Sequence, residues 1–186
     1  VPANSVTYDI NELTQFQLTC QVSASPAADR VEWLYFSDKQ SNKNNFKIAS
    51  NTSLLQIQSV THSLASGYFV CLATNKMTDS FGVTKIGKVL SRRVELNVKF
   101  MPQMYLPFKK IAANLTKVTM DKPNFKQNIT CKSLANPAPE FTWYKDGMQL
   151  FQTDSKTKYV IRTVKVEGQS SLYESTLIIN ELGVLD

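Results

Sequence analysis

The chain has 186 residues, of which 42% are hydrophobic, and it carries 21 Lys and Arg against 15 Asp and Glu. This is an ordinary composition for a globular protein, and the length gives room for two domains of about a hundred residues each. The sequence has no apolar run of about eighteen residues, so we expect no membrane-spanning segment. The first residues also lack the charged start and the apolar stretch of a signal peptide.

Short segments rich in β-forming residues recur between clusters of Asn, Ser, Asp, Gly and Pro, which predicts an all-β protein. In the first half of the chain the expected strands are residues 16–22, 30–36, 53–59, 67–74 and 94–98. The last of them runs straight into Phe100-Met101-Pro102 without a Gly/Ser-rich linker. We therefore expect two domains with limited freedom between them.

The second half of the chain repeats this plan. Strands are expected at residues 128–131, 141–147 and 159–166, and another is expected to end near Leu177 and Ile179. The turn into the second of these strands is Asn136-Pro137-Ala138-Pro139. The two halves are therefore expected to share one architecture.

Cysteine and tryptophan follow the same spacing in both halves. Cys20 and Trp33 are followed by Cys71 in the run Gly67-Tyr68-Phe69-Val70-Cys71, and Cys131 is followed by Trp143. This pattern resembles the core signature of the immunoglobulin superfamily, and the second half resembles its I-set domains. The resemblance implies two tandem immunoglobulin-like β-sandwiches, residues 1–99 and 100–186, from a cell-surface adhesion molecule or receptor ectodomain. It also implies a disulfide between Cys20 and Cys71.

The resemblance implies that the second domain is truncated before its strands F and G. I-set domains continue with Asp-x-Gly-x-Tyr-x-Cys, and Asp186 matches only the first of these residues. Cys131 is then expected to lack its partner within this chain, unless the protein truly ends there and the thiol is free or intermolecular. The first domain departs from the I-set pattern, because Ala65 replaces the aspartate and Phe69 the tyrosine whose hydroxyl forms the corner hydrogen bond.

Sequence motifs also indicate an oxidising, secretory route. Three Asn-x-Ser/Thr tripeptides are possible N-glycosylation sites. They begin at Asn51, Asn114 and Asn128. Together with the cysteine pattern, they favour an extracellular protein.

An enzyme is not expected from this sequence. The single histidine, His62, lies between two expected strands and is predicted to be a solvated loop residue, and Asp9 and Glu12 are predicted to be solvated strand ends. There are too few ligands for a zinc site, and no phosphate-binding loop, serine nucleophile elbow or other cofactor motif is present. A nucleic-acid partner is not expected either, because no recognition-helix pattern occurs.

Strand alternation predicts a surface for a protein partner on the first domain. If Cys20, Trp33 and Cys71 point inward, alternate residues on the strands of Trp33 and Cys71 point outward and form an apolar face. The expected outward residues are Leu34, Phe36, Tyr68, Val70 and Leu72. The alternative is that another segment covers this face, or that a β-bulge shifts the alternation.

A long hairpin, residues 75–93, is a second candidate for contact with a partner, through Met77 and Phe81. The alternative is a plain strand extension with a loose tip. Basic residues nearby could bind heparan sulfate, or could simply be solvated surface charge. These residues are Lys85, Lys88, Arg92 and Arg93, with Lys99, Lys109 and Lys110 further along the chain.

The leading hypothesis is therefore extracellular protein–protein recognition, in cell adhesion or receptor ligand binding, with the second domain as a spacer. The alternative is a secreted protein of the same superfamily that sequesters a growth factor or hormone. An intracellular muscle-type I-set module and a heparan-binding matrix component also remain open, as does homophilic against heterophilic binding.

Overall fold

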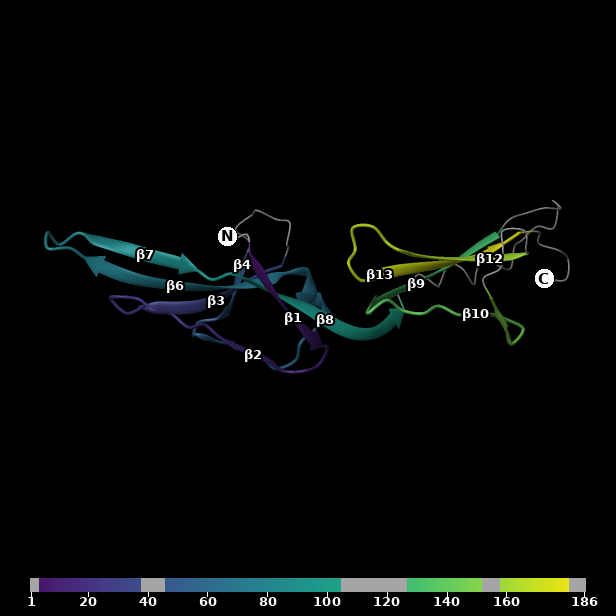
Figure 1. Ribbon diagram of the computed structural model, residues 1–186, viewed down its shortest axis with the longest axis horizontal. Helices are drawn as coiled ribbons and strands as arrows, with labels where there is room; N and C mark the ends of the chain where they lie inside the picture. The colour runs from purple at the N-terminus through teal and green to yellow at the C-terminus, as the bar shows by residue number, and fades with distance from the viewer. Residues whose placement is uncertain (1–3, 38–45, 105–126, 152–157, 181–186) are drawn as a thin grey trace. The chain divides into compact units, whose positions relative to one another are not determined.

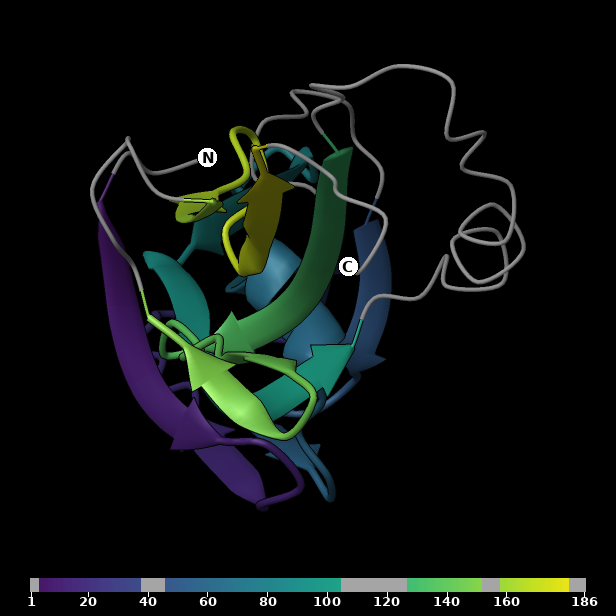
Figure 2. The same ribbon diagram turned by 90° about the vertical axis from the view of Figure 1, so that its right-hand side faces the viewer.

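The computed structural model describes residues 4–37, 46–104, 127–151 and 158–180 (Figures 1 and 2). By its internal contacts the chain divides into two compact units, Val1–Phe100 and Met101–Asp186. The described residues form thirteen β-strands and one 3-10 helix, so the all-β prediction is confirmed. Among the residues singled out from the sequence, Lys109, Lys110, Asn114 and Asp186 lie outside the described ranges.

The first unit contains two sheets. Its strands are β1 (Ser5–Asn11), β2 (Phe16–Thr19), β3 (Arg30–Phe36), β4 (Phe46–Ser50), β5 (Leu54–Ile57), β6 (Tyr68–Thr78), β7 (Thr84–Leu90) and β8 (Arg93–Met104, which ends in the second unit). The larger sheet has the order β4-β3-β6-β8, with β1 parallel to β8 and β7 antiparallel to β6. The smaller sheet is the antiparallel pair β2–β5.

Some strands of the first unit differ in length from the prediction, and the strands that pair with them explain the differences. β3 has the expected bounds, 30–36, whereas β2 ends at Thr19 rather than at residue 22. Its pairing with β5 ends where Thr19 lies opposite Leu54, and one further backbone hydrogen bond joins Cys20 to Ser53. β6 runs four residues beyond the expected end at Thr74 because β7 pairs with it as far as Thr78.

The core of the first unit lies between the two sheets. A buried cluster combines residues of both sheets with Val60, which precedes the 3-10 helix η1 (His62–Ser66). Its members are Phe16, Trp33, Leu55, Val60, Phe69, Cys71, Val94, Leu96 and Val98. Burial of these apolar side chains is the main stabilising contribution to such a fold.

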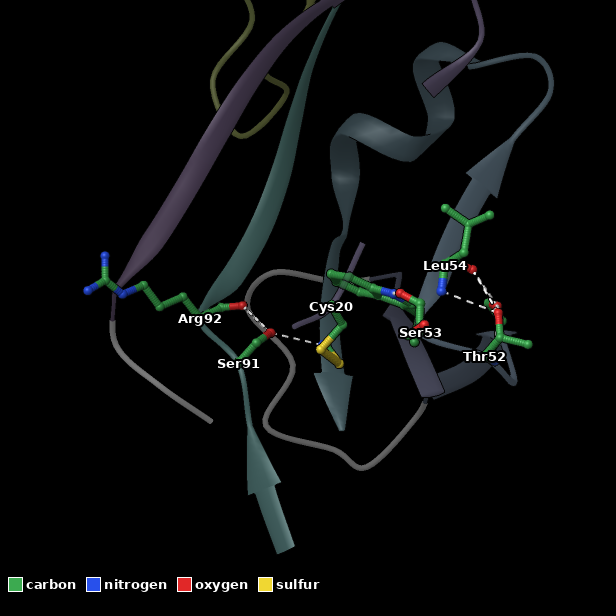
Figure 3. The surroundings of a disulfide bond; sticks show 9 residues. Cys20, Thr52, Ser53, Leu54, Ser91 and Arg92 are labelled. Atoms are coloured by element: carbon green, nitrogen blue, oxygen red, sulfur yellow. Dashed lines mark hydrogen bonds between the residues drawn. A yellow bond between two sulfur atoms is a disulfide. The ribbon is translucent and has the colours of Figure 1, made fainter. Parts of the chain in front are cut away.

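A disulfide between Cys20 and Cys71 joins the two sheets, as the resemblance implied (Figure 3). Trp33 is only 2% exposed and donates its indole N–H to the carbonyl of Ser53 at 2.9 Å. The same carbonyl accepts the backbone N–H of Cys20 at 2.8 Å. On the other side of the bridge the backbone N–H of Cys71 donates to Ser91 Oγ at 2.9 Å.

The second unit has its own sheet, in the order β12-β13-β9, with the end of β8 beside β9. Its strands are β9 (Gln127–Asn136), β10 (Trp143–Lys145), β11 (Met148–Leu150), β12 (Tyr159–Lys165) and β13 (Leu172–Ile179). Trp143 donates its indole N–H to the buried Ser175 Oγ at 3.0 Å. Cys131 lies opposite Ser175 in the sheet and has a free thiol, whose pKa is raised by burial.

The expected strand at residues 141–147 is wrong in its extent. Only Trp143–Lys145 is a strand, and it pairs with β11 across a two-residue turn. Asp146 and Gly147 form this turn, with φ of 50° and 79°. An Asp-Gly pair suits such a turn because both residues need positive φ, and glycine reaches it without strain.

Candidate functional site

The outward face of the larger sheet in the first unit is where the sequence predicted a partner surface. Phe36 lies opposite Tyr68, and Leu34 opposite Val70. The core cluster contains Phe69, which lies between Tyr68 and Val70, and the neighbouring pair Trp33 and Cys71. The alternation is therefore as predicted, and the irregular register between Trp33 and Leu34 affects only the pairing of β3 with β4. By this register the outward face comprises Glu32, Leu34, Phe36, Phe46, Ile48, Tyr68, Val70, Leu72, Leu90 and Arg93.

Four of these residues form a continuous row across the sheet, which we name the aromatic row. The rings of Phe46 and Phe36 lie 5.6 Å apart, and those of Phe36 and Tyr68 stack at 4.8 Å with an interplanar angle of 8°. The guanidinium of Arg93 lies over the Tyr68 ring, 4.6 Å from its centroid. Such ring and cation–π contacts hold the row in one arrangement before any partner binds.

The expectation that the centre of this face is open to solvent is wrong. Leu34, Tyr68 and Val70 are 4%, 3% and 1% exposed, and Phe36 and Leu72 are half-buried. Tyr68 is covered because Phe36 stacks on one side of it and Arg93 lies over its ring. Alternation predicts the direction of a side chain, but not how much its neighbours leave uncovered.

The exposed apolar area of the face lies at its edges instead. On β4, Phe46 and Ile48 are 46% and 54% exposed, although they lie opposite Phe36 and Leu34. On β7, Leu90 is 38% exposed. Sequence reasoning missed β4, although the alternation of Phe46 and Ile48 is a strand signal.

An ion pair between an exposed arginine and a buried carboxylate lies on the same face. The carboxylate of Glu32, whose side chain is 7% exposed, lies 2.6 Å from a guanidinium nitrogen of Arg30. Leu72 is opposite Glu32 across the strands. Arg30 itself is largely exposed, so the pair connects a buried acid to solvent and limits the cost of burying it.

The part of the β6–β7 hairpin beyond the end of β3, residues 75–86, is named here the hairpin arm. It has no β3 partner, because β3 begins at Arg30, opposite Thr74, and Figure 1 shows the hairpin extending past that strand. At its tip Asp79 Oδ1 accepts the backbone N–H groups of Phe81 and Val83 at 2.9 and 3.0 Å. The apolar side chains of the arm are strongly exposed, at 44% for Met77, 89% for Phe81, 52% for Val83 and 61% for Ile86.

A hollow of ≈ 220 Å³ lies between the segment 22–28 and the base of this hairpin. It is lined by Val22, Ser23, Ala24, Ala28, Ala73, Thr74, Asn75, Gly87, Lys88 and Val89. Asn75 Nδ2 donates to the carbonyl of Pro26 at 3.0 Å and so ties the hairpin to the facing segment. No sequence signal indicates the hollow, because its two walls are about fifty residues apart.

The basic residues that the sequence suggested for heparan sulfate do not lie on one face. Lys85 and Lys88 belong to alternate sides of β7, since their partners on β6 are Met77 and Thr74. Arg93 lies over the Tyr68 ring. Lys85 is therefore separated from Lys88 and Arg93, which share the side of Leu90, and heparan binding remains a prediction.

The prediction that His62 is merely a solvated loop residue is wrong. Its Nδ1 lies 2.7 Å from Glu12 Oε1, which also accepts the backbone N–H of His62 at 3.0 Å, and its ring stacks on Phe100 at 4.8 Å. These two hydrogen bonds hold the pKa of Glu12 below its usual value. The carboxylate of Asp9 is not simply solvated either, because hydrogen bonds from Asn97 and Lys99 lower its pKa. The contacts of Asp9 join β1 to β8, and those of Glu12 join the loop after β1 to His62.

The described ranges contain no cluster of metal-binding side chains. Within them, no three His, Cys, Asp or Glu side chains lie close enough together to hold a metal ion. The same part of the chain contains no helix that could cross a membrane.

Two of the predicted glycosylation sites are described, and both asparagines are exposed. We expect the chain, expressed through a secretory pathway, to carry glycans at Asn51 and Asn128. Enzymatic removal of N-glycans should lower the mass of the chain. In the variants N51Q and N128Q this loss of mass should be smaller, by the mass of the one glycan that each variant lacks. N97Q, which alters an exposed asparagine outside any such tripeptide, is the matched control. An unchanged mass after the enzyme treatment would contradict the prediction.

Comparisons of sequence and of structure both find similarity to immunoglobulin domains. Residues 1–75 match the family model described as an immunoglobulin domain. Hemicentin-2 of Mus musculus is 22% identical over 172 residues, which is 90% of this chain and 3% of that protein. Hemicentin-1 of Homo sapiens is 24% identical over 144 residues, or 77% of this chain and 2% of that protein. The chain thus spans only a small part of the length of these relatives.

Among solved structures, the complex of Dpr2 Ig1-Ig2 with DIP-Theta Ig1-Ig3 has a similar fold. Its matching chain gives a TM-score of 0.61 at 18% identity, over 100% of this chain and 56% of that one. At this identity the likeness concerns the fold.

Proposed function

We propose that the chain, whose residues 1–75 match the immunoglobulin domain family, is an extracellular or cell-surface recognition protein without enzymatic activity. In this proposal residues 1–99 form the recognition domain, which binds another protein through its outward face and hairpin arm. Residues 100–186 form a second domain of the same kind, which acts as a spacer.

The observation that carries the proposal is the exposed end of the aromatic row. Phe46 is about half exposed, and the stacked Phe36 and Tyr68 behind it support it. Exposed apolar side chains that cluster on a soluble domain commonly mark an interaction site, and aromatic residues and arginine dominate binding energy in interfaces. A row that is already ordered loses little conformational entropy on binding.

The hairpin arm supplies a second group of exposed apolar side chains, with Phe81 at its tip. The Asp79 carboxylate fixes the backbone around Phe81, so the tip has a defined shape despite its exposure. Strongly exposed aromatic side chains in an ordered turn suit insertion into a partner's pocket.

The solved relative supports a protein partner. The solved complex that contains the matching chain joins Dpr2 to DIP-Theta, and both proteins are present through their immunoglobulin domains. We propose the same class of partner for this chain, either a copy of itself or another protein. The alternative partner is a soluble growth factor or hormone, which a secreted form of the chain would sequester.

The test is binding of the multimerised 186-residue chain to a panel of immunoglobulin-superfamily ectodomains, itself included, and of growth factors and hormones. F46D places a charge at the exposed end of the aromatic row, so we expect about tenfold or greater loss of affinity for the partner found. Q56D is the matched control, because Gln56 is exposed on the other sheet. Equal affinity for wild type and a folded F46D variant would rule out the outward face.

A further inference from the structure

We propose that the open edge of β7 binds an extended, acidic segment of a partner protein as an added β-strand. This inference rests on the proposed function, because it describes how a recognition domain of this kind would hold its partner. It concerns the main chain of residues 84–90 rather than the aromatic row.

The edge of β7 is open in the described part of the chain. There β7 pairs with β6 alone, whereas β8 has β1 beside it. Two backbone hydrogen bonds fix the alternation at both ends of the pair: Asp79 N–H to Val83 O at 3.1 Å and Ser91 N–H to Cys71 O at 2.8 Å. Val83, just before β7, and every second residue after it therefore hydrogen-bond to β6 through their backbone; in β7 these are Lys85, Gly87 and Val89.

The remaining residues of β7 direct their backbone groups away from β6, since an antiparallel strand alternates the two directions. These residues are Thr84, Ile86, Lys88 and Leu90. They leave an unpaired row of N–H and C=O groups on a seven-residue strand. Such an edge is a template for a further strand.

The charges near this edge favour an acidic occupant. Lys85 and Lys88 are both exposed on β7, and Arg92 is exposed just beyond it. The carboxylate of Asp79, in the turn before β7, already accepts two backbone N–H groups. A second copy of β7 would bring further lysines to the edge, whereas carboxylates on an added strand would lie within reach of Lys85 on one side and Lys88 on the other.

The two sides of β7 also offer places for the partner's alternate side chains. One side faces the hollow, whose wall includes Gly87 and Val89. The opposite side carries the half-exposed Leu90 of the outward face. A strand added to β7 sends successive side chains to these two sides, so both can contribute to selectivity.

The test uses hydrogen exchange of the backbone amides in the full 186-residue chain. The probe is a synthetic eight-residue peptide in which pairs of Glu alternate with pairs of Val, so that carboxylates face both sides of the added strand. Strand addition protects the amides of Ile86 and Lys88, so we expect their exchange to slow by about tenfold or more at saturating peptide. The amides of Lys85 and Gly87, already bonded to β6, should change little. The same peptide with Lys in place of Glu should give no protection.

Two variants sharpen the test. I86P removes one outward N–H and keeps the ladder to β6, as proline is tolerated on edge strands, and it should weaken peptide binding by about fivefold or more. K88E reverses a charge beside the added strand and should weaken binding by about fivefold. F46D, which disrupts the proposed aromatic surface, should leave peptide binding unchanged, so failure of the proposed function is distinguishable from failure of this inference.

Three results would overturn the inference. Protection of the β7 amides that rises with protein concentration without peptide would identify a second copy as the occupant. Protection by heparin fragments and not by the acidic peptide would identify a glycan. Strand addition would be excluded if the peptide protected the amides of Lys85 and Gly87 as much as those of Ile86 and Lys88, or if it protected no amide of β7.

Discussion

Replacing Cys20 and Cys71 together by alanine is expected to lower the free energy of unfolding of the first unit by about 4 kcal/mol. The disulfide joins residues 51 positions apart and so restricts the unfolded chain. Cys71 is also 2% exposed in the core cluster, so the variant loses packing as well. Denaturant unfolding followed by Trp33 fluorescence, in a background with W143F, measures the difference.

The control for this prediction is C131A, which removes the free thiol of the second unit. It should leave the Trp33 transition within about 0.5 kcal/mol of the wild type, because it changes no contact of the first unit. If the double cysteine variant unfolds at the same denaturant concentration as the wild type, the disulfide is not the cross-link that holds the two sheets.

Placing a carboxylate at Val70 is expected to destabilise the first unit by about 3 kcal/mol or more. Val70 points to the outward face, yet it is 1% exposed, so an aspartate there would lose its hydration without gaining a partner. Ile48 belongs to the same face and is 54% exposed, so I48D should cost less than about 1 kcal/mol.

Thermal or denaturant unfolding of the two variants side by side checks this prediction. A large loss for V70D with a small one for I48D supports a covered centre with an open edge. Small losses for both would mean that the centre of the face is solvated, as strand alternation alone suggested.

The spacing of Cys20, Trp33 and Cys71 was sufficient to predict the fold, because a cross-link and a large buried indole constrain both sheets. β3 could be predicted residue for residue, since its ends coincide with its pairing to β6. The turn at Asp146 was missed although the Asp-Gly signal was present in the sequence.

The features that sequence reasoning missed depend on contacts between distant residues. Glu12 and His62 are 50 positions apart, and nothing in either local sequence indicates that they pair. The burial of Leu34 depends on neighbouring strands rather than on its own alternation. Within the described ranges the outer edge of β7 is unpaired, since β1 pairs with residues 93–99 of β8 instead, and no pattern within 84–90 predicts this.

The most direct measurement of the central claim is hydroxyl-radical footprinting of the 186-residue chain, free and bound to the partner that the binding panel identifies. In the free protein Phe46, Met77 and Phe81 are exposed and should be oxidised, as should Tyr144 in the second unit. If the outward face and the hairpin arm bind the partner, binding should protect Phe46, together with Met77 or Phe81, and leave Tyr144 unchanged. Protection of Tyr144 with continued oxidation of Phe46 and Phe81 would contradict this proposal, and would place recognition in the second unit.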